Sequence, residues 1–77
     1  EVRAWYDGQR AKAAADLVLQ LRGLRPLAGG VTPRRVTDVV YGLLSPQLHA
    51  LLVRERGWRP QRYAAWSADA IARALWG

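Results

Sequence analysis

Residues 54–69, with the sequence RERGWRPQRYAAWSAD, combine a tight corner with the start of a helix. Gly57 suits the left-handed backbone position that follows a helix, and Pro60 suits the first position of the next helix. From Pro60 onward, alanines and aromatic residues recur at helical spacing. The stretch therefore predicts two helices that meet at a corner, the second of them covering about residues 60–75.

A longer helix is predicted before the corner, over residues 33–56. Thr32 can cap its first amides, and Pro33 suits its first helical position. Near its middle, Pro46 lacks the N–H that continues the helical hydrogen bonds, and its ring disturbs a straight helix. We expect a kink at Ser45-Pro46. The alternative is a split, in which Ser45 caps a new helix that begins at Pro46.

The first helix is predicted over residues 2–22, with Gly23 at its left-handed end and Pro26 preventing its continuation. Its apolar stripe is predicted to contain Tyr6, Ala13, Leu17, Leu21 and Leu24. No segment has the pattern of a strand, and no internal repeat occurs. Together, these patterns predict an all-α fold of three helices.

The helix predicted at residues 33–56 is apolar on nearly all sides. Valines and leucines cover a broad arc of it, and only a narrow strip with Asp38, Ser45 and His49 is polar. A helix of this kind must be covered on nearly all sides. Two neighbours from a short chain cannot provide that cover, so we expect an additional partner to complete it.

The composition limits the chain to one small domain. It has 77 residues, half of them hydrophobic, and a net charge of +6 that is nearly all arginine. Because there is no cysteine, disulfides, thiolate zinc sites and thiol catalysis are excluded. No apolar run approaches the ~20 residues of a membrane span. We expect a cytoplasmic chain without a membrane partner, cut from a longer protein because it starts at Glu1 without a methionine.

Sequence motifs of enzymes are missing from the chain. It contains no HExxH, GxSxG, P-loop or GxGxxG pattern, and His49 is its single histidine. The six carboxylates are scattered over faces that look solvated. We therefore expect no catalytic site, no metal and no cofactor, and an ordinary polar environment for His49.

The arginines near the corner allow two interpretations. Arg54, Arg56, Arg59 and Arg62 straddle a turn, whereas a nucleic-acid-binding helix aligns its basic residues on one face to follow the phosphates. A solvated corner is the preferred interpretation. Direct phosphate binding remains the alternative.

The inner faces of the last two predicted helices are candidates for a dimer interface, because small side chains allow close approach and aromatic ones add buried area. The candidates are Val36, Val40, Leu43, Leu51, Tyr63, Trp66, Ser67, Ala70, Ile71 and Ala74. Trp5 lies off the main apolar stripe of its helix and Tyr41 at the edge of another. With Leu44 and Leu48, these two are the candidates for a ligand pocket.

Residues 44–69 resemble the C-terminal end of TetR-type bacterial transcription regulators. That family's pattern runs approximately T-S-P-E-hydrophobic-Y-x-L-L-V-x-x-R-G-W-S-P-E-R-Y-x-x-W-L-A-D, and the specific part here is R-G-W-x-P-x-R-Y-x-x-W. The chain departs from the pattern at Leu44, at Gln47 and Gln61 in place of glutamates, at Arg59 in place of a capping serine, and at Ser67 in place of leucine. These departures prevent any transfer of ligand preference.

The resemblance implies a function for the whole chain. In such regulators the last two long helices pair with those of a second copy as a four-helix bundle, and preceding helices enclose a small effector. An N-terminal helix-turn-helix, absent from residues 1–77, reads operator DNA. The chain is thus expected to be the dimerising, effector-sensing region of a ligand-responsive repressor and not to bind DNA itself. The alternative is a stand-alone basic helical module that binds nucleic acid or an acidic protein.

Overall fold

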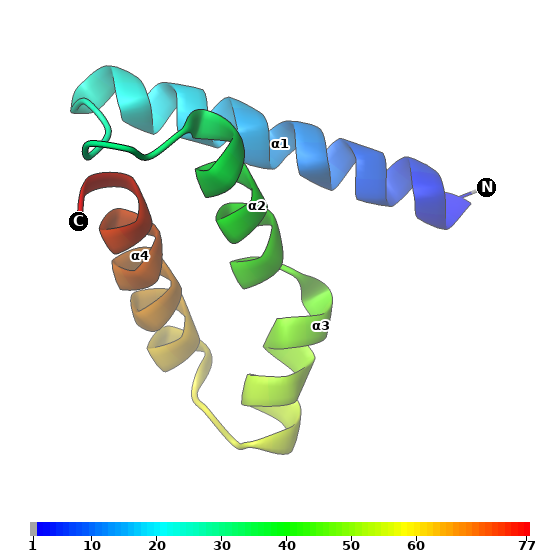
Figure 1. Cartoon of the computed structure of the whole chain (residues 1–77). Helices are drawn as coiled ribbons and strands as arrows, with labels where there is room; N and C mark the ends of the chain where they lie inside the picture. Colours follow the sequence, from blue (N-terminus) through cyan, green and yellow to red (C-terminus); the bar gives the residue numbers. More distant parts are fainter. Residues whose placement is uncertain (1) are drawn as a thin grey trace.

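The computed structural model describes residues 2–77, which contain helices and connecting loops and no strand. The elements are α1 (Val2–Leu24), α2 (Pro33–Leu43), α3 (Pro46–His49), the π-helical segment η1 (Ala50–Glu55) and α4 (Pro60–Trp76) (Figure 1). The predicted all-α class is confirmed. The predicted number of three helices is wrong, because the second helix is divided.

The division lies at Ser45-Pro46. α2 ends at Leu43, and Ser45 has an extended backbone (φ −75°, ψ 145°) with its Oγ accepting the Leu48 N–H at 3.1 Å. Pro46 then occupies the first turn of α3. The expected kink in a continuous helix is therefore wrong, and the alternative split is what the chain adopts. The physical reason is that Pro46 cannot donate to a carbonyl of the preceding turn and its ring disturbs a continuous helix, whereas after the split Ser45 caps the first amides of α3.

Two other start signals behave as predicted. Thr32 is extended, and its Oγ1 accepts the Arg35 N–H at 3.2 Å, so it caps α2 with Pro33 next to it. Pro60 opens α4 after Arg59, whose side chain makes no capping hydrogen bond. The missing cap agrees with arginine standing where a serine was expected.

The corner between η1 and α4 is closed by backbone bonds. The Arg56 N–H bonds to the Leu51 carbonyl at 3.0 Å, and the Trp58 N–H bonds to the Leu52 carbonyl at 2.9 Å. Gly57 has a φ of +74°, which confirms its left-handed position. The first of these bonds spans five residues, so the turn is wider than an α-helical turn.

The first helix differs slightly from its prediction. α1 continues to Leu24, two residues beyond the expected end, and Gly23 stays helical. The stripe that α1 buries contains Ala14 and Val18, whereas Ala13, Tyr6 and Leu24 are exposed. The predicted apolar stripe was thus rotated by about one residue.

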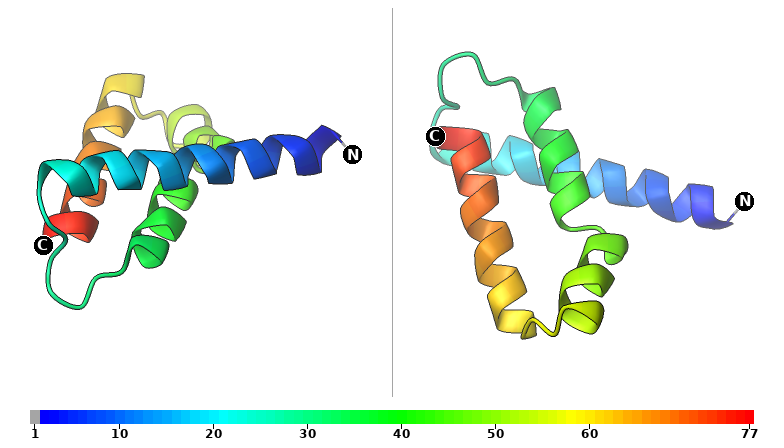
Figure 2. Two further views of the ribbon diagram at one scale, coloured as in Figure 1. Left: turned by 90° about the horizontal axis from the view of Figure 1, so that it is seen from above. Right: turned by 60° about the horizontal axis from the view of Figure 1, so that its bottom comes forward.

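The core forms where α1 crosses α2 and the C-terminal half of α4 (Figure 2). Its buried members are Ala14 and Val18 from α1, Val36 and Val40 from α2, and Ile71 and Leu75 from α4. The loop after α1 is fixed to the end of α4, because the Ala28 N–H bonds to the Leu75 carbonyl at 2.8 Å and Trp76 Nε1 bonds to the Arg25 carbonyl at 3.0 Å.

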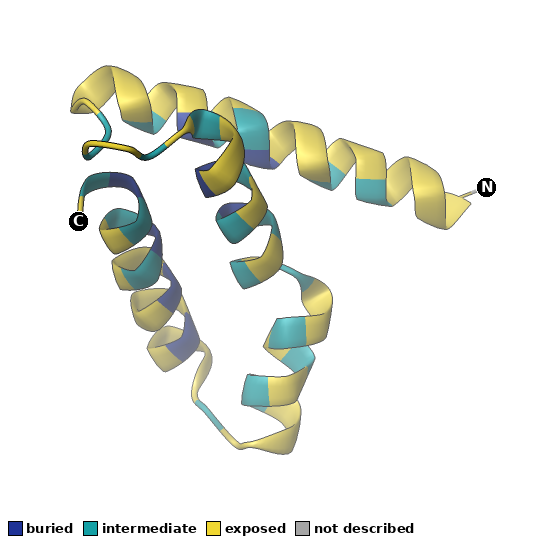
Figure 3. Ribbon diagram, viewed as in Figure 1, coloured by how far each residue is buried: buried dark blue, intermediate teal, exposed yellow. Residues whose placement is uncertain are grey.

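The molecule is thin, with extents of 36 × 32 × 17 Å. An α-helix with its side chains is about 10 Å across, so the short dimension holds at most two layers. The second layer is α1 alone, and it reaches only part of the first. α3 and η1 contain no buried residue, as their colouring in Figure 3 shows.

Within residues 2–77, no single helix is both long and apolar enough to cross a membrane. α2 and Pro46–Glu55 meet those criteria only when taken together, and they are bent by 42° at the break.

Candidate ligand pocket and interface

The break between α2 and α3 leaves carbonyl groups that need hydrogen-bond donors. The Ser45 N–H bonds to the Gly42 carbonyl at 3.2 Å, so it does not reach Tyr41, four residues back. Arg10 Nη2, from α1, donates to the Tyr41 carbonyl at 3.1 Å. The hydroxyl of Tyr63, from α4, donates to the Leu43 carbonyl. Side chains from both neighbouring helices therefore hold the end of α2.

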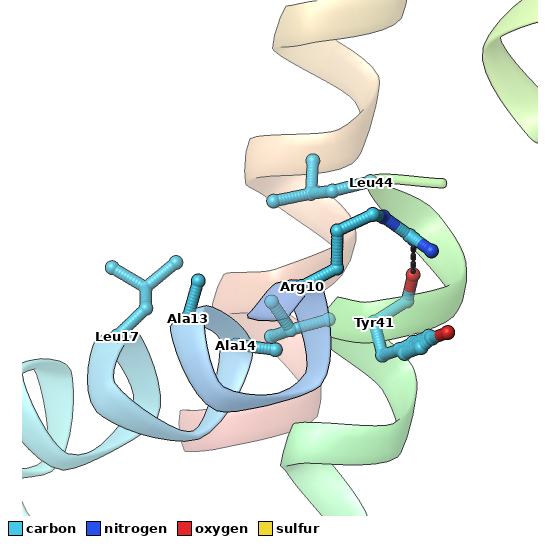
Figure 4. Close-up of a pocket in the computed structure, with 7 residues that line it drawn as sticks. Arg10, Ala13, Ala14, Leu17, Tyr41 and Leu44 are labelled. Carbon is cyan, nitrogen blue, oxygen red and sulfur yellow. Dashed lines mark hydrogen bonds between the residues drawn. The ribbon is translucent and has the colours of Figure 1, made fainter. Parts of the chain in front are cut away.

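A pocket of about 200 Å³ lies beside this joint, between α1 and α2 (Figure 4). It is lined by Arg10, Ala13, Ala14 and Leu17 of α1, by Val40 and Tyr41 of α2, and by Leu44 just after α2. Most of the lining is aliphatic. Arg10 is the only charged residue in it.

Arg10 is held on three sides. Its guanidinium carbon lies 4.4 Å from the ring centroid of Tyr41, within the range of a cation–π contact. Its Nη1 lies 3.6 Å from Asp7 Oδ1, an ion pair one helical turn away but longer than a hydrogen bond. The arginine side chain is 27% exposed. Its charge is thus fixed in direction and partly removed from water.

The structure brings two of the four predicted pocket residues together. Tyr41 and Leu44 line the pocket. Trp5 lies near the N-terminal end of α1, is 60% exposed, and contacts Tyr6 edge-to-face at 5.2 Å between ring centroids. Leu48 is half-buried in α3 and does not line this pocket. Both stand outside it.

Sequence reasoning missed the pocket residues on α1. Arg10, Ala14 and Leu17 follow one another at spacings of four and three, as residues on one helix face do. That spacing was a usable signal. It was overlooked because the predicted apolar stripe, which contains Ala13 and Leu17, did not include Arg10.

Half of the predicted interface residues lie inside the single chain. Val36, Val40, Tyr63, Ser67 and Ile71 are all buried against other parts of the same molecule. Leu43, Ala70 and Ala74 are half-buried, and Leu51 and Trp66 are exposed, at 51% and 40%. Of the ten predicted interface residues, only these last five have surface that a second molecule could contact.

Four of these five lie on one side of the α2–α4 layer. The α2–α4 layer has hollows on both sides. On one side, residues of α1 line the pocket beside Tyr41 and also a groove beside Ala72. On the other side, a groove that includes Val39 and Ala74 has no lining residue from α1. Leu43 follows Val39 by four residues, and Trp66 and Ala70 precede Ala74 by eight and four, so each set shares a helix face. We call Val39, Leu43, Trp66, Ala70 and Ala74 the outer face.

Aromatic contacts hold the corner together. Trp58 and Trp66 meet edge-to-face with ring centroids 5.7 Å apart, and the guanidinium carbon of Arg62 lies 4.0 Å from the Trp58 ring centroid. His49, which is exposed, meets Tyr63 edge-to-face at 5.2 Å. Arg62 is therefore used in packing. Arg62 is nevertheless exposed, as are the other three arginines of the corner, Arg54, Arg56 and Arg59.

No cluster of three or more metal-ligating side chains occurs within the described residues. Comparison of the chain with protein-family models, curated proteins and solved structures found no match. The TetR-type assignment therefore stays a prediction from the sequence motif.

Proposed function

We propose that this chain is the dimerising and effector-binding region of a ligand-responsive bacterial transcription regulator of the TetR type. In this proposal it acts in the cytoplasm, without catalysis or a cofactor. It holds two DNA-reading domains at a fixed distance, each a helix-turn-helix outside residues 1–77. The spacing of two such domains must match about one turn of DNA or a multiple of it. The small effector binds in the pocket between α1 and α2.

The observation that carries the proposal is the amount of surface the chain leaves uncovered. The described molecule exposes 5692 Å². A compact monomer of 8.6 kDa exposes about 4,700 Å² by the size scaling of folded proteins. The excess of about 1,000 Å² is close to the ~800 Å² that each partner buries in a standard interface. The exposed area is thus sufficient for a dimer.

The outer face combines small and apolar side chains of the kind found in helix-on-helix interfaces, and its groove is bordered by Arg35 and Arg73. Ala70 and Ala74 leave room for a close approach of two helices, and Trp66 beside them adds a large apolar surface. Val39 and Leu43 extend the same face onto α2. A second copy placed there would form a bundle from α2 and α4 of both copies, as the resemblance implies.

Sedimentation velocity of the chain and of two variants tests the dimer. Ala70→Glu places a charge on the outer face, whereas Ala65→Glu places the same charge on an exposed position of the same helix. We expect the unmodified chain to dimerise at micromolar concentration. Ala70→Glu should weaken the dimer by at least about tenfold, the effect of a central interface residue, and Ala65→Glu should leave it unchanged. A monomer at high micromolar concentration would contradict the proposal.

The second candidate function, a basic module that binds nucleic acid, is favoured by the exposed Arg54, Arg56 and Arg59 at the corner. Binding through phosphates weakens steeply as salt rises, whereas a hydrophobic dimer does not. A titration of the chain with duplex DNA at several salt concentrations distinguishes the two. We expect no binding at physiological salt, and salt-dependent retention of DNA by the chain alone would support the second candidate.

A further inference from the structure

We propose that the pocket between α1 and α2 takes a small apolar molecule with one carboxylate group, and that Arg10 binds the carboxylate. This inference rests on the proposed function, because it names the class of effector for the same pocket. It rests on two properties of the pocket, its apolar lining and the placement of its single charge.

The lining selects an apolar body of limited size. Ala13, Ala14, Leu17 and Leu44 present only aliphatic carbon to the cavity. Apolar cavities of about 150 Å³ can hold a benzene-sized molecule. The pocket has a similar volume of about 200 Å³ but is partly open to solvent, so it suits an aromatic ring or a short branched chain that keeps one end in water.

The charge selects the head group. A guanidinium has five N–H donors in a planar fork, and Arg10 uses one in its hydrogen bond to the Tyr41 carbonyl. Its contact with Asp7 at 3.6 Å is too long to occupy another donor firmly. Donors remain for a carboxylate, which guanidinium groups bind in a charge-assisted and often bidentate manner. No acidic residue lines the pocket, and the guanidinium of Arg10 already lies against the ring of Tyr41, so a cationic ligand would find no free partner and would be repelled by Arg10.

The position of Arg10 means that ligand binding can be detected at nearby backbone amides. The same guanidinium that would meet the carboxylate also supports the Tyr41 carbonyl at the end of α2. A ligand on Arg10 should therefore change the environment of the amides from Tyr41 to Ser45, at the joint before α3. Amides near the Trp58 corner should change little.

The experiment titrates the chain with phenylacetate, phenethyl alcohol and phenethylammonium, which carry the same ring and differ in charge. Calorimetry gives the affinities, and amide chemical shifts give the place of binding. We expect phenylacetate to bind about tenfold more tightly than the alcohol, as a hydrogen bond to a charged group predicts, and the ammonium to bind more weakly than both.

Three variants test the assignment to residues. Arg10→Gln should remove the preference for phenylacetate over the alcohol. The matched control Arg22→Gln, at an exposed arginine in the last turn of α1, should retain it. Ala13→Leu should fill the cavity and weaken the binding of both molecules. Circular dichroism of each variant verifies that the helices are intact.

The outcomes separate this inference from the proposed function. Equal affinities for phenylacetate and the alcohol would overturn the ligand class, and a preference that survives Arg10→Gln would overturn the role of Arg10. Absence of binding by all three molecules would remove the small-ligand pocket. A loss of self-association in Ala13→Leu would show that a second copy occupies the pocket instead. Dimerisation itself is measured separately, on the outer face.

Discussion

The half of the molecule crossed by α1 and the half built from α3 and η1 have similar apolar content but different burial. α2 carries three valines, a tyrosine and a leucine, and the segment Pro46–Glu55 carries three leucines, a valine and an alanine. α2 buries Val36 and Val40 completely, whereas α3 and η1 bury nothing. The difference lies in α1, which covers one half and not the other. Whether the apolar side chains of α2, α3 and η1 are buried therefore depends on whether α1 covers them, and not on how apolar each segment is.

The uncovered half is held by specific contacts instead of a core. Tyr63 bonds to the Leu43 carbonyl through its hydroxyl and meets His49 through its ring, and Trp58 packs against Trp66. Each of these contacts joins α4 to the segment before it. The comparison therefore predicts that substitutions in the two halves differ in cost, even when the chemical change is the same.

The largest expected effect comes from the same substitution made in both halves. Leu75→Ala removes a side chain with no exposure from the core, and should lower the free energy of unfolding by about 3 kcal/mol. Leu48→Ala removes a half-buried side chain from α3 and should cost about 1 kcal/mol. Urea unfolding measures both.

These measurements need a protein concentration at which the chain is monomeric, because self-association adds to apparent stability. If Leu75→Ala and Leu48→Ala lowered the free energy of unfolding of the monomer equally, the proposed difference between the two halves would be wrong. A cost for Leu48→Ala that grows with protein concentration would sharpen it, since a second copy would then be covering the exposed half.

The next effect tests the contact that fixes the uncovered half to α2. Tyr63→Phe keeps the ring and removes the hydroxyl that donates to the Leu43 carbonyl. The variant should lose about 1 kcal/mol, the usual net value of such a bond. Thermal unfolding measures the loss. Tyr41→Phe is the matched control and should lose less, because the Tyr41 hydroxyl makes no hydrogen bond among the described residues, which contact its carbonyl and its ring.

The same serine-to-alanine change should have opposite signs at two positions. The Oγ of Ser67 is buried without a hydrogen-bond partner among the described residues, so Ser67→Ala should stabilise the chain by about 1 kcal/mol. The Oγ of Ser45 caps α3, so Ser45→Ala should destabilise it by a similar amount, about 1 kcal/mol. Chemical denaturation of both variants measures the difference. A loss of stability in Ser67→Ala would show that its hydroxyl has a partner, such as a buried water.

Local signals in the sequence predicted most helix ends, but the left-handed end expected at Gly23 was wrong because Gly23 stays helical. Thr32, Gly57 and Pro60 each have the predicted role, because capping and left-handed positions depend on a few neighbouring atoms. Ser45-Pro46 carried equally local information, but a kink in one continuous helix was expected and the split was the alternative. In the structure Ser45 caps α3, so the local signal decided the outcome.

Features that depend on how helices cross were predicted less well. Apolar residues cover several sides of α1 around Ala13, Ala14 and Val18, so periodicity alone did not identify the buried side. The pocket depends on where α1 meets α2, and that crossing sets which residues line it. Tyr41 was found because it lies at the edge of its apolar arc. Arg10 was not, since its long-range bond to Tyr41 has no counterpart in the local sequence.

The smallest expected effect concerns the ion pair of Asp69 and Arg73 on α4. Their atoms Oδ2 and Nε lie 2.8 Å apart, but the two side chains are 64% and 76% exposed. Water and salt screen such pairs, so Asp69→Asn should cost no more than about 0.5 kcal/mol, measured by urea unfolding. The difference should shrink further at high salt. Because Asp69 lies one residue from Ala70 of the outer face, the stability cost of Asp69→Asn also tests whether a second copy contacts this region. A cost above about 1 kcal/mol that rises with protein concentration would exceed any exposed pair within one chain, and would place Asp69 in contact with a second copy.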